Sequence, residues 1–572
     1  MQMRTLVVAA ALAGLVGLGC ANGSGDASPD SGDTTGTGGN STGTGGETGT
    51  GGTTSGAGGT TSTGSGGHGV AGTSGAAGKA GAGGTIGTGG TSTGGVSGTG
   101  GTSGTGVAGA TGRGGGAGGT AGAMAGGTGG NSGAAGKGAT GGTNTGGSSG
   151  AAGHGTGGGT STGGATGTGG ASDPCSASNA AVPLPTIGAA SFNVTTYGAV
   201  GDGKTDNTTA IQAALTAAGA AGGGTVTIPS GTFLSGPIVI GSSTRLDLAS
   251  GAVLKMLPMA SYPTSGVAFI TSSGTTHDIA LTGAGTIDGQ GQDWWDAFAN
   301  GSTAARPQEV SLGKVTRVLV SGIRLQNSPE EHIWVKSDTD VTITGITIAT
   351  PGTSGKSPPK NTDGVDVSAT GMYFCNNNIV AGDDNIAMGG TNLYLGYSTF
   401  GVGHGCSIGS ITQNGVSGVT VDHLTFNGTT SGIRMKSARD RGGTVQNLTY
   451  SNITMTNVQN PIYITSYYPT LPTDPSADTA MAVTATTPIW KNITIKNVTV
   501  TGSTNAGILW GLPEEKIATV VFDNVKIQAT TGMEIFHASG VSFTNGSSVT
   551  PKSGAAVTTY DADVSGITTT AY

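Results

Sequence analysis

The hydrophobic positions in the C-terminal part of the chain repeat in one short pattern. Four apolar residues are spaced apolar-x-apolar-x-x-apolar-x-apolar, and six copies fit this spacing fully. Alternation within a copy marks two short strands, and the two-residue step between them marks a bend. When two imperfect copies that start at Met372 and Leu393 are included, successive copies start roughly 21 to 31 residues apart, apart from one longer gap, and this spacing is about one turn of a parallel β-helix. The six copies are Val318/Val320/Ile323/Leu325, Val341/Ile343/Ile346/Ile348, Val419/Val421/Leu424/Phe426, Leu448/Tyr450/Ile453/Met455, Ile493/Ile495/Val498/Val500 and Val520/Phe522/Val525/Ile527.

Two further copies carry one polar residue each among the four positions. They are Met372/Phe374/Asn377/Ile379 and Leu393/Leu395/Ser398/Phe400. The bends are often Gly or Asn, residues that tolerate left-handed backbone. An immunoglobulin-like sandwich would need hairpin signals between strands of alternating direction, whereas here the same pattern recurs in the same order. The chain is therefore predicted to be all-β, a single-stranded parallel β-helix or solenoid.

A solenoid needs its open ends covered. Asp206 and Asn207 precede the Ala-rich segment 208–218, in which Ile211 and Leu215 are one helical turn apart. This segment is predicted to be an amphipathic helix that caps the N-terminal end. We expect the β-helix domain to occupy residues 176–572.

The residues before this domain have a different composition. Residues 1–20 contain Arg4, an apolar run and a Gly19-Cys20 pair, which is typical of a secretory signal. The segment resembles a bacterial lipoprotein signal, which implies lipidation of Cys20, with cleavage and release as the alternative. Residues 21–175 are almost entirely Gly, Thr, Ser and Ala, so they are predicted to form a disordered linker.

The cysteines are too few for a disulfide framework. Of four, Cys20 is assigned to the signal, and Cys175, Cys375 and Cys406 lack zinc-ligand spacing. In the repeat, Cys406 shares the inward side of Ile408, whereas Cys375 points outward. Because these two face opposite ways, we expect both to be unpaired thiols.

Short polar clusters interrupt consecutive copies of the repeat at equivalent places. Because strands of adjacent coils lie about 4.8 Å apart, these clusters are expected to gather in one cleft that spans four neighbouring coils. They are Asn361-Thr362-Asp363, Asp383-Asp384, Gly403-His404-Gly405 and Arg434-Met435-Lys436.

The residue types in these clusters suit hydrolysis of a glycosidic bond in an acidic sugar polymer. Such a reaction needs one protonated carboxyl group and one carboxylate that activates water or attacks the sugar. Three close carboxylates cannot all ionise cheaply, so the pKa of one should be raised. His404 could keep the acid protonated or orient it, and Arg434 and Lys436 would meet a substrate carboxylate.

The chain from about Phe192 onward resembles the polygalacturonase family of glycoside hydrolases, glycoside hydrolase family 28. The motifs that carry the resemblance are Asn361-Thr362-Asp363-Gly364, Gly382-Asp383-Asp384-Asn385, Gly403-His404-Gly405-Cys406-Ser407-Ile408-Gly409 and Arg434-Met435-Lys436. The resemblance implies a right-handed β-helix that hydrolyses α-1,4 bonds between galacturonates with inversion. It implies no metal and no other cofactor.

The resemblance also implies a role for each residue of the cleft. Asp383 would be the general acid, Asp363 and Asp384 would position and activate water, and His404 would support them. Asp366 is interpreted instead as a residue that satisfies local backbone groups. The residues implied to bind substrate are Arg434, Lys436, Asn361 and Tyr468.

The partners follow from these assignments. We expect a pectic polysaccharide as substrate and a monomeric protein, with membrane contact only through a lipid at Cys20. The net charge of −8 argues against nucleic acid. Three other functions stay open: a rhamnogalacturonan hydrolase, a Ca²⁺-dependent pectate lyase on the same scaffold, and a carbohydrate-binding β-helix without turnover.

Overall fold

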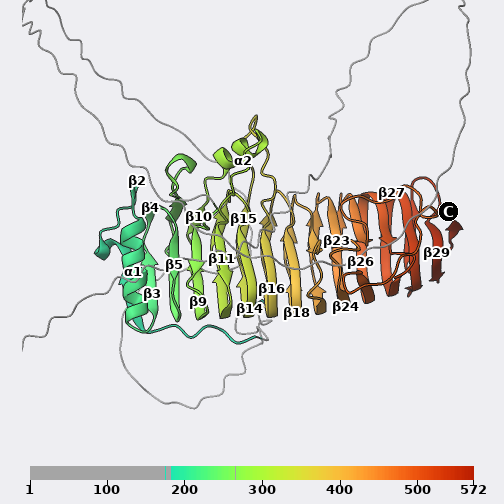
Figure 1. The fold of residues 1–572 in the computed structure, drawn as a ribbon, viewed down its shortest axis with the longest axis horizontal. Coiled ribbons are helices and arrows are strands. Elements are labelled where there is room, and N and C mark those ends of the chain that lie inside the picture. The colour runs from blue at the N-terminus through green and yellow to red at the C-terminus, as the bar shows by residue number, and fades with distance from the viewer. Residues whose placement is uncertain (1–173, 176–181, 264–265) are drawn as a thin grey trace, which may run out of the picture. The chain divides into compact units, whose positions relative to one another are not determined.

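The computed structural model describes residues 174–175, 182–263 and 266–572. The predicted signal peptide and nearly all of the predicted linker lie outside the described residues. The described residues form a right-handed parallel β-helix whose coils follow one another from α1 to β29 (Figure 1). The fold predicted from the repeat is therefore confirmed. Of the described helices, none has the length and apolar character that a membrane span requires.

The elements of the first coils are α1 (Thr208–Ala220), α2 (Gln292–Ala299), η2 (Val194–Tyr197), η3 (Met259–Ser261), β1 (Ala190–Asn193), β2 (Asp202–Asp206), β3 (Gly224–Ile228), β4 (Gly231–Ser235), β5 (Ile238–Ile240), β6 (Thr244–Leu248), β7 (Ala252–Met256), β8 (Ile270–Ser272), β9 (Thr276–Gly283), β10 (Thr286–Asp288), β11 (Val310–Gly313), β12 (Val315–Ser321) and β13 (Arg324–Gln326). The later strands are β14 (Ile333–Thr344), β15 (Thr347–Ala349), β16 (Val365–Cys375), β17 (Asn378–Val380), β18 (Ile386–Gly396), β19 (Thr399–Phe400), β20 (Cys406–Ile408), β21 (Val416–Asp422), β22 (Thr425–Asn427), β23 (Ser431–Lys436), β24 (Thr444–Thr456), β25 (Asn460–Thr465), β26 (Ile489–Trp510), β27 (Ile517–Thr544), β28 (Ser548–Pro551), β29 (Val557–Ser565) and β30 (Thr570–Ala571).

Helix α1 covers the N-terminal end of the coils, as the sequence predicts (Figure 1). The Asp206 carboxylate accepts a hydrogen bond from the Thr208 N–H at 2.9 Å, which satisfies one of the free donors of the first turn. Ile211 and Leu215 are buried on the face that packs against the first coil. The helix therefore shields apolar side chains that would otherwise meet water.

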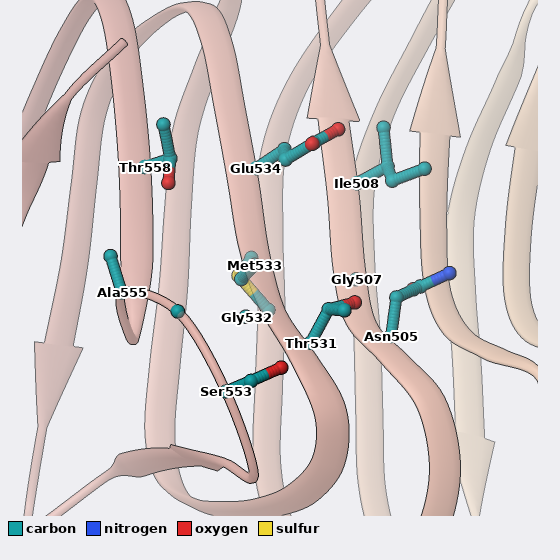
Figure 2. Close-up of a pocket in the computed structure, with 11 residues that line it drawn as sticks. Asn505, Gly507, Ile508, Thr531, Gly532, Met533, Glu534, Ser553, Ala555 and Thr558 are labelled. Atoms are coloured by element: carbon teal, nitrogen blue, oxygen red, sulfur yellow. The ribbon is translucent and has the colours of Figure 1, made fainter.

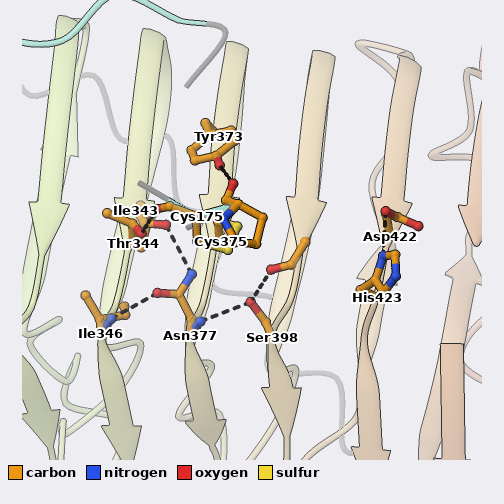
Figure 3. Close-up of a disulfide and its surroundings, with 12 residues drawn as sticks. Cys175, Ile343, Thr344, Ile346, Tyr373, Cys375, Asn377, Ser398, Asp422 and His423 are labelled. Carbon is orange, nitrogen blue, oxygen red and sulfur yellow. Dashed lines mark hydrogen bonds and ion pairs between the residues drawn. A yellow bond between two sulfur atoms is a disulfide. The ribbon is translucent and has the colours of Figure 1, made fainter. Parts of the chain in front are cut away.

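The apolar repeat forms one continuous core. Every residue of the six full copies is buried, and so are the polar residues Asn377 and Ser398 of the two imperfect copies. The Ser398 hydroxyl accepts a hydrogen bond from the backbone N–H of Asn377 at 3.0 Å and donates one to the Gly396 carbonyl at 2.8 Å. The Asn377 amide also bonds to the Ile343 carbonyl and the Ile346 N–H (Figure 3). The repeat therefore tolerates a buried polar residue where its partners are supplied by neighbouring coils.

Asparagines at the bends adopt the left-handed backbone that their composition suggests. Asn452, Asn497 and Asn524 have φ values of 55°, 53° and 53°. The side-chain amide of Asn497 donates to Asn452, and that of Asn524 donates to Asn497, at 3.1 and 3.0 Å. Equivalent bends thus stack into a ladder that holds successive coils in register.

The structure corrects the prediction for one cysteine. Cys375 is not a free thiol, because it forms a disulfide with Cys175, while Cys406 is unpaired and buried as expected. Cys375 does face outward, and there it meets a segment from outside the repeat rather than another coil. The Tyr373 hydroxyl donates to the Pro174 carbonyl at 2.7 Å and the Thr344 hydroxyl to the Cys175 carbonyl at 3.1 Å (Figure 3). The last residue of the predicted linker is therefore bonded to the wall of the solenoid.

We predict that this disulfide stabilises the fold. The bond joins residues separated by 200 positions, so it restricts the unfolded chain strongly. Replacing both cysteines, Cys175→Ser with Cys375→Ser, should lower the free energy of unfolding by about 2 to 5 kcal/mol. Urea denaturation measures the change.

Reductant provides the control for this experiment. It should lower the stability of the native protein toward that of the double variant and leave the variant unchanged, since Cys406 is free in both. Equal stability of the oxidised protein and the double variant would show that the bond contributes nothing.

Candidate active site

The polar clusters lie on four successive coils at matching positions. Val365 pairs with Ile386, Ile386 with Cys406 and Cys406 with Ile433 in parallel strands. We call such a column of residues in register a lane. The lane two residues before these contains Asp363, Asp384 and His404.

Asp384 is the centre of the cluster. Its carboxylate accepts hydrogen bonds from Arg434 Nη1 at 2.8 Å and Lys436 Nζ at 3.1 Å, and its side chain is only 4% exposed. Ser407 Oγ donates a third bond at 2.7 Å. Burial favours the neutral acid, but Lys436 and Arg434 outweigh it and hold the pKa of Asp384 well below its usual range. Asp384 is therefore an anion that two buried cations compensate.

The sequence motifs did not assign Ser407 a function. It follows Cys406 in the Gly-His-Gly motif, and its register with Arg434 could have shown that it faces the cleft. Its hydroxyl donates a hydrogen bond to Asp384 Oδ1 and so helps to orient that carboxylate.

Asp383 and His404 form a hydrogen-bonded pair beside Asp384. His404 Nδ1 lies 2.8 Å from Asp383 Oδ1, and the His404 N–H also donates to the Asp383 carbonyl at 2.8 Å. The two side chains are 17% and 21% exposed, so the pair faces the solvent. Burial lowers the pKa of His404, but the hydrogen bond and charge of Asp383 outweigh it and raise that pKa. The pair can therefore hold a proton at a position open to substrate.

Asp363 lies on the coil before Asp384, among other carboxyl groups. Burial and the charges of Asp366, Asp383 and Asp384 raise the pKa of Asp363 well above its usual range. Asp366 has a strongly raised pKa as well, for which burial is the main cause, followed by the charge of Glu331. Two ionisable groups in one cluster thus favour the neutral form, while Asp384 stays ionised.

Asp366 and Glu331 show where interpretation of the sequence was incomplete. Asp366 lies in β16 rather than at a turn, its Oδ1 has no hydrogen-bond partner, and its carboxyl group is hydrogen-bonded to that of Asp363. Glu331 belongs to the lane of Asp363, and burial together with the charge of Glu330 raises its pKa to about 7. The register of Ile333 with Val365 is the signal that could have found it.

Asn361 and Tyr468 lie on either side of the cluster. Asn361 Nδ2 donates to Asp383 Oδ2 at 3.4 Å, and Arg306 Nη2 donates to Asn361 Oδ1 at 3.1 Å. Lys436 Nζ lies 5.1 Å from the centre of the Tyr468 ring, a cation–π contact. The neighbouring Tyr467 instead donates its hydroxyl to Asp478. All eight residues predicted for the cleft are therefore brought together.

Two glycines allow the loops to approach this closely. A Cβ on Gly405, whose φ is +83°, would lie 2.1 Å from the Ser431 carbonyl oxygen, and one on Gly382 would lie 1.6 Å from that of Pro359. Both glycines are adjacent to a residue of the pair, His404 or Asp383. Their missing side chains let adjacent coils bring these groups into contact.

The cluster also has to be judged as a metal site. Asp383, Asp384 and His404 each offer one ligand atom, and these atoms lie within 4.8 Å of one another. However, Asp384 already accepts from Arg434 and Lys436, whose charges would repel a metal ion. These three side chains are therefore better suited to binding and transferring protons than to coordinating a metal ion.

Comparisons with known proteins agree with this geometry. Residues 220–548 match the family model described as glycosyl hydrolases family 28. The chain is 33% identical over 372 residues to an endo-polygalacturonase of Pectobacterium carotovorum subsp. carotovorum, which covers 58% of this chain and 87% of the relative. It is 34% identical over 307 residues to a polygalacturonase of Prunus persica, which covers 51% of this chain and 75% of the relative.

A solved structure shares the fold. The exopolygalacturonase of Thermotoga maritima superposes with a TM-score of 0.51 at 20% identity. The superposition covers 67% of this chain and 93% of the Thermotoga chain. The β-helix, its cluster of carboxyl groups and these matches together place the protein among carbohydrate-active solenoid enzymes. The chain belongs to glycosyl hydrolases family 28 and is a glycoside hydrolase, so the resemblance noted in its motifs is confirmed.

We predict that Gly405→Ala distorts the site. The left-handed backbone and the contact with Ser431 should together cost about 1 to 3 kcal/mol of stability. Thermal unfolding measures this loss. Gly313→Ala is the matched control, because its Cβ would meet only the Lys336 carbonyl oxygen at 3.6 Å. Equal melting temperatures for the two variants would contradict the steric argument.

Proposed function

We propose that the protein hydrolyses α-1,4-galacturonosidic bonds in pectin and polygalacturonate, with inversion and without a metal ion. The observation that carries the proposal is Asp384, held between Arg434 and Lys436 next to the Asp383–His404 pair. Two cations in a cleft of carboxyl groups suit a sugar that carries its own carboxylate. Family membership and the polygalacturonases at 33 and 34% identity support this choice.

Asp383 serves as the general acid. It is partly exposed and therefore accessible to the leaving oxygen of the bound chain. His404 Nδ1 lies 2.8 Å from Asp383 Oδ1, and Asp383 raises the pKa of His404, so a proton on the imidazole next to Asp383 is favoured. Proton transfer from such a positioned group to the glycosidic oxygen assists bond cleavage.

Asp363 and Asp384 position and activate the attacking water. Their lane lies beside Asp383, with Asp384 ionised and Asp363 favouring the neutral form. A neutral carboxyl can donate a hydrogen bond to water, and an ionised one can accept its proton. One group therefore orients the water while the other removes its proton.

Arg434 and Lys436 link substrate binding to the state of Asp384. In the free protein both cations are occupied by the Asp384 carboxylate. A galacturonate carboxylate competes for the same donors, and the cations it draws away no longer lower the pKa of Asp384. A higher pKa makes Asp384 a stronger base, so the correct substrate itself improves water activation.

The location of the activity is proposed from the N-terminal sequence and the disulfide. The Cys175–Cys375 bond suits an oxidising compartment outside the cytosol. We propose that the protein acts outside the cell, on a lipid anchor at Cys20 with residues 21–175 as a tether. Residues 1–173 lie outside the described residues, so mass spectrometry of the mature N-terminus is the direct test.

We predict that the protein releases reducing ends from polygalacturonate in the presence of a chelator, without new ultraviolet absorbance. Asp383→Asn should abolish this release, because the amide cannot supply the proton, yet it should retain substrate binding. Ultraviolet absorbance that depends on Ca²⁺ would indicate elimination instead. Binding without either signal would indicate a carbohydrate-binding protein, and full activity of Asp383→Asn would contradict its role.

We also predict that Lys436→Ala acts mainly on binding. Loss of one cation that contacts the substrate carboxylate should raise KM about tenfold and change kcat less. Lys496→Ala is the matched control, since Lys496 lies on β26 opposite Asp523 of β27, outside the group of residues predicted to bind substrate. Unchanged KM in Lys436→Ala would exclude this residue from substrate recognition.

A further inference from the structure

A surface pocket lies nearer the C-terminal end of the solenoid than Arg434 and Lys436 do. It has a volume of about 410 Å³ and is formed by β26, β27, β29 and the loop before β29. Its polar side chains are those of Asn505, Thr531, Glu534, Ser553 and Thr558 (Figure 2). Hydroxyl, amide and carboxyl groups around a small apolar floor can form hydrogen bonds with the hydroxyl groups of a sugar unit.

The pocket lies in the same lanes as the active site. Arg434 pairs with Tyr463, Tyr463 with Ile508 and Ile508 with Glu534. At about 4.8 Å per strand, Glu534 is roughly 14 Å from Arg434 along the stack. A polysaccharide that runs across the strands from Asp383 past Arg434 therefore reaches this pocket next.

A second lane connects the two sites through hydrogen bonds. The Asn505 amide donates to the Asn460 side chain, and the Asn460 amide donates to the Thr430 carbonyl at 3.3 Å. The Thr430 N–H donates to the carbonyl of Gly403, next to His404, at 2.8 Å. Asn505 Oδ1 is buried at the pocket and has no hydrogen-bond partner. The pocket is thus built on the same turns as the cleft.

The charge of the pocket is opposite to that of the substrate-binding cations. Among the described residues, no lysine or arginine lines it, and Glu534 is its one ionisable side chain. Lys552 precedes Ser553 in the chain but is exposed and not part of the lining. A galacturonate carboxylate placed here would meet a like charge without a cation.

We propose that this pocket binds an uncharged pyranose unit of the pectic chain, on the side of Arg434 and Lys436 away from Asp383. The proposal rests on the proposed function, because it takes the pocket as part of the same substrate groove. Two units have the required chemistry, a methyl-esterified galacturonate and a neutral hexose. The enzyme would then prefer chains in which a charged unit at the cations is followed by an uncharged one.

Calorimetric binding to the Asp383→Asn protein tests this proposal without turnover. The probes are galacturonate octamers that are fully charged, or that carry one methyl ester or one neutral hexose at either end. We expect about tenfold tighter binding when the uncharged unit is at one particular end. The methyl ester and hexose arms then distinguish the two sources.

Variants of Glu534 decide whether the pocket causes the preference. Glu534→Gln should bring the charged and uncharged octamers to equal affinity, and Glu534→Lys should reverse their order. Asp563→Asn removes an acid from β29, the neighbouring strand that contributes Thr558 to the pocket, but lies outside the pocket lining and should keep the tenfold preference. No preference in the parent protein, or a preference that survives Glu534→Gln, would overturn the proposal. Failure of the native protein to cleave any octamer would instead contradict the proposed function. The calorimetric comparison would still test whether the pocket prefers an uncharged unit.

Discussion

The in-register stacking of parallel coils is the constraint on which the rest of the structure depends. Each coil pairs with the next at fixed positions, so residues far apart in sequence fall into one lane about 4.8 Å from their neighbours. Asp384 and Lys436 are separated by 52 positions, yet they lie 3.1 Å apart because only two coil steps separate their strands. The buried apolar repeat fixes this register, since a slip of one residue would turn the core side chains to solvent.

This geometry also explains why the cleft can hold so many ionisable groups. Desolvation alone would force the carboxyl groups to take up protons, and that is the state favoured at Asp363 and Asp366. At Asp384 the two cations reverse the balance, at the cost of burying Arg434 and Lys436. A substrate carboxylate can take the place of the Asp384 carboxylate as the hydrogen-bond acceptor of Arg434 and Lys436. Recognition and catalysis are then coupled through one set of hydrogen bonds rather than through a change of fold.

Much of the fold and the placement of the site could be predicted from the sequence, because both follow from local periodicity. The spacing around Phe374 and Phe400 shows which side chains turn inward, and it placed Asp383 and His404 on neighbouring coils. The partner of Cys375 could not be predicted in this way, since Cys175 comes from outside the repeat and 200 residues away. Asp366 was misinterpreted because its residue type is common at turns, whereas its place in β16 depends on pairing with Ala387. The pKa directions likewise depend on burial by several coils together.

The most direct test of this account is a crystal structure of the Asp383→Asn protein with a galacturonate oligomer bound. The account predicts a chain that runs across the strands, with one uronate carboxylate within hydrogen-bond distance of Arg434 and Lys436 and Lys436 no longer bonded to Asp384. An oligomer on another face of the solenoid, or one that leaves both cations on Asp384, would contradict it.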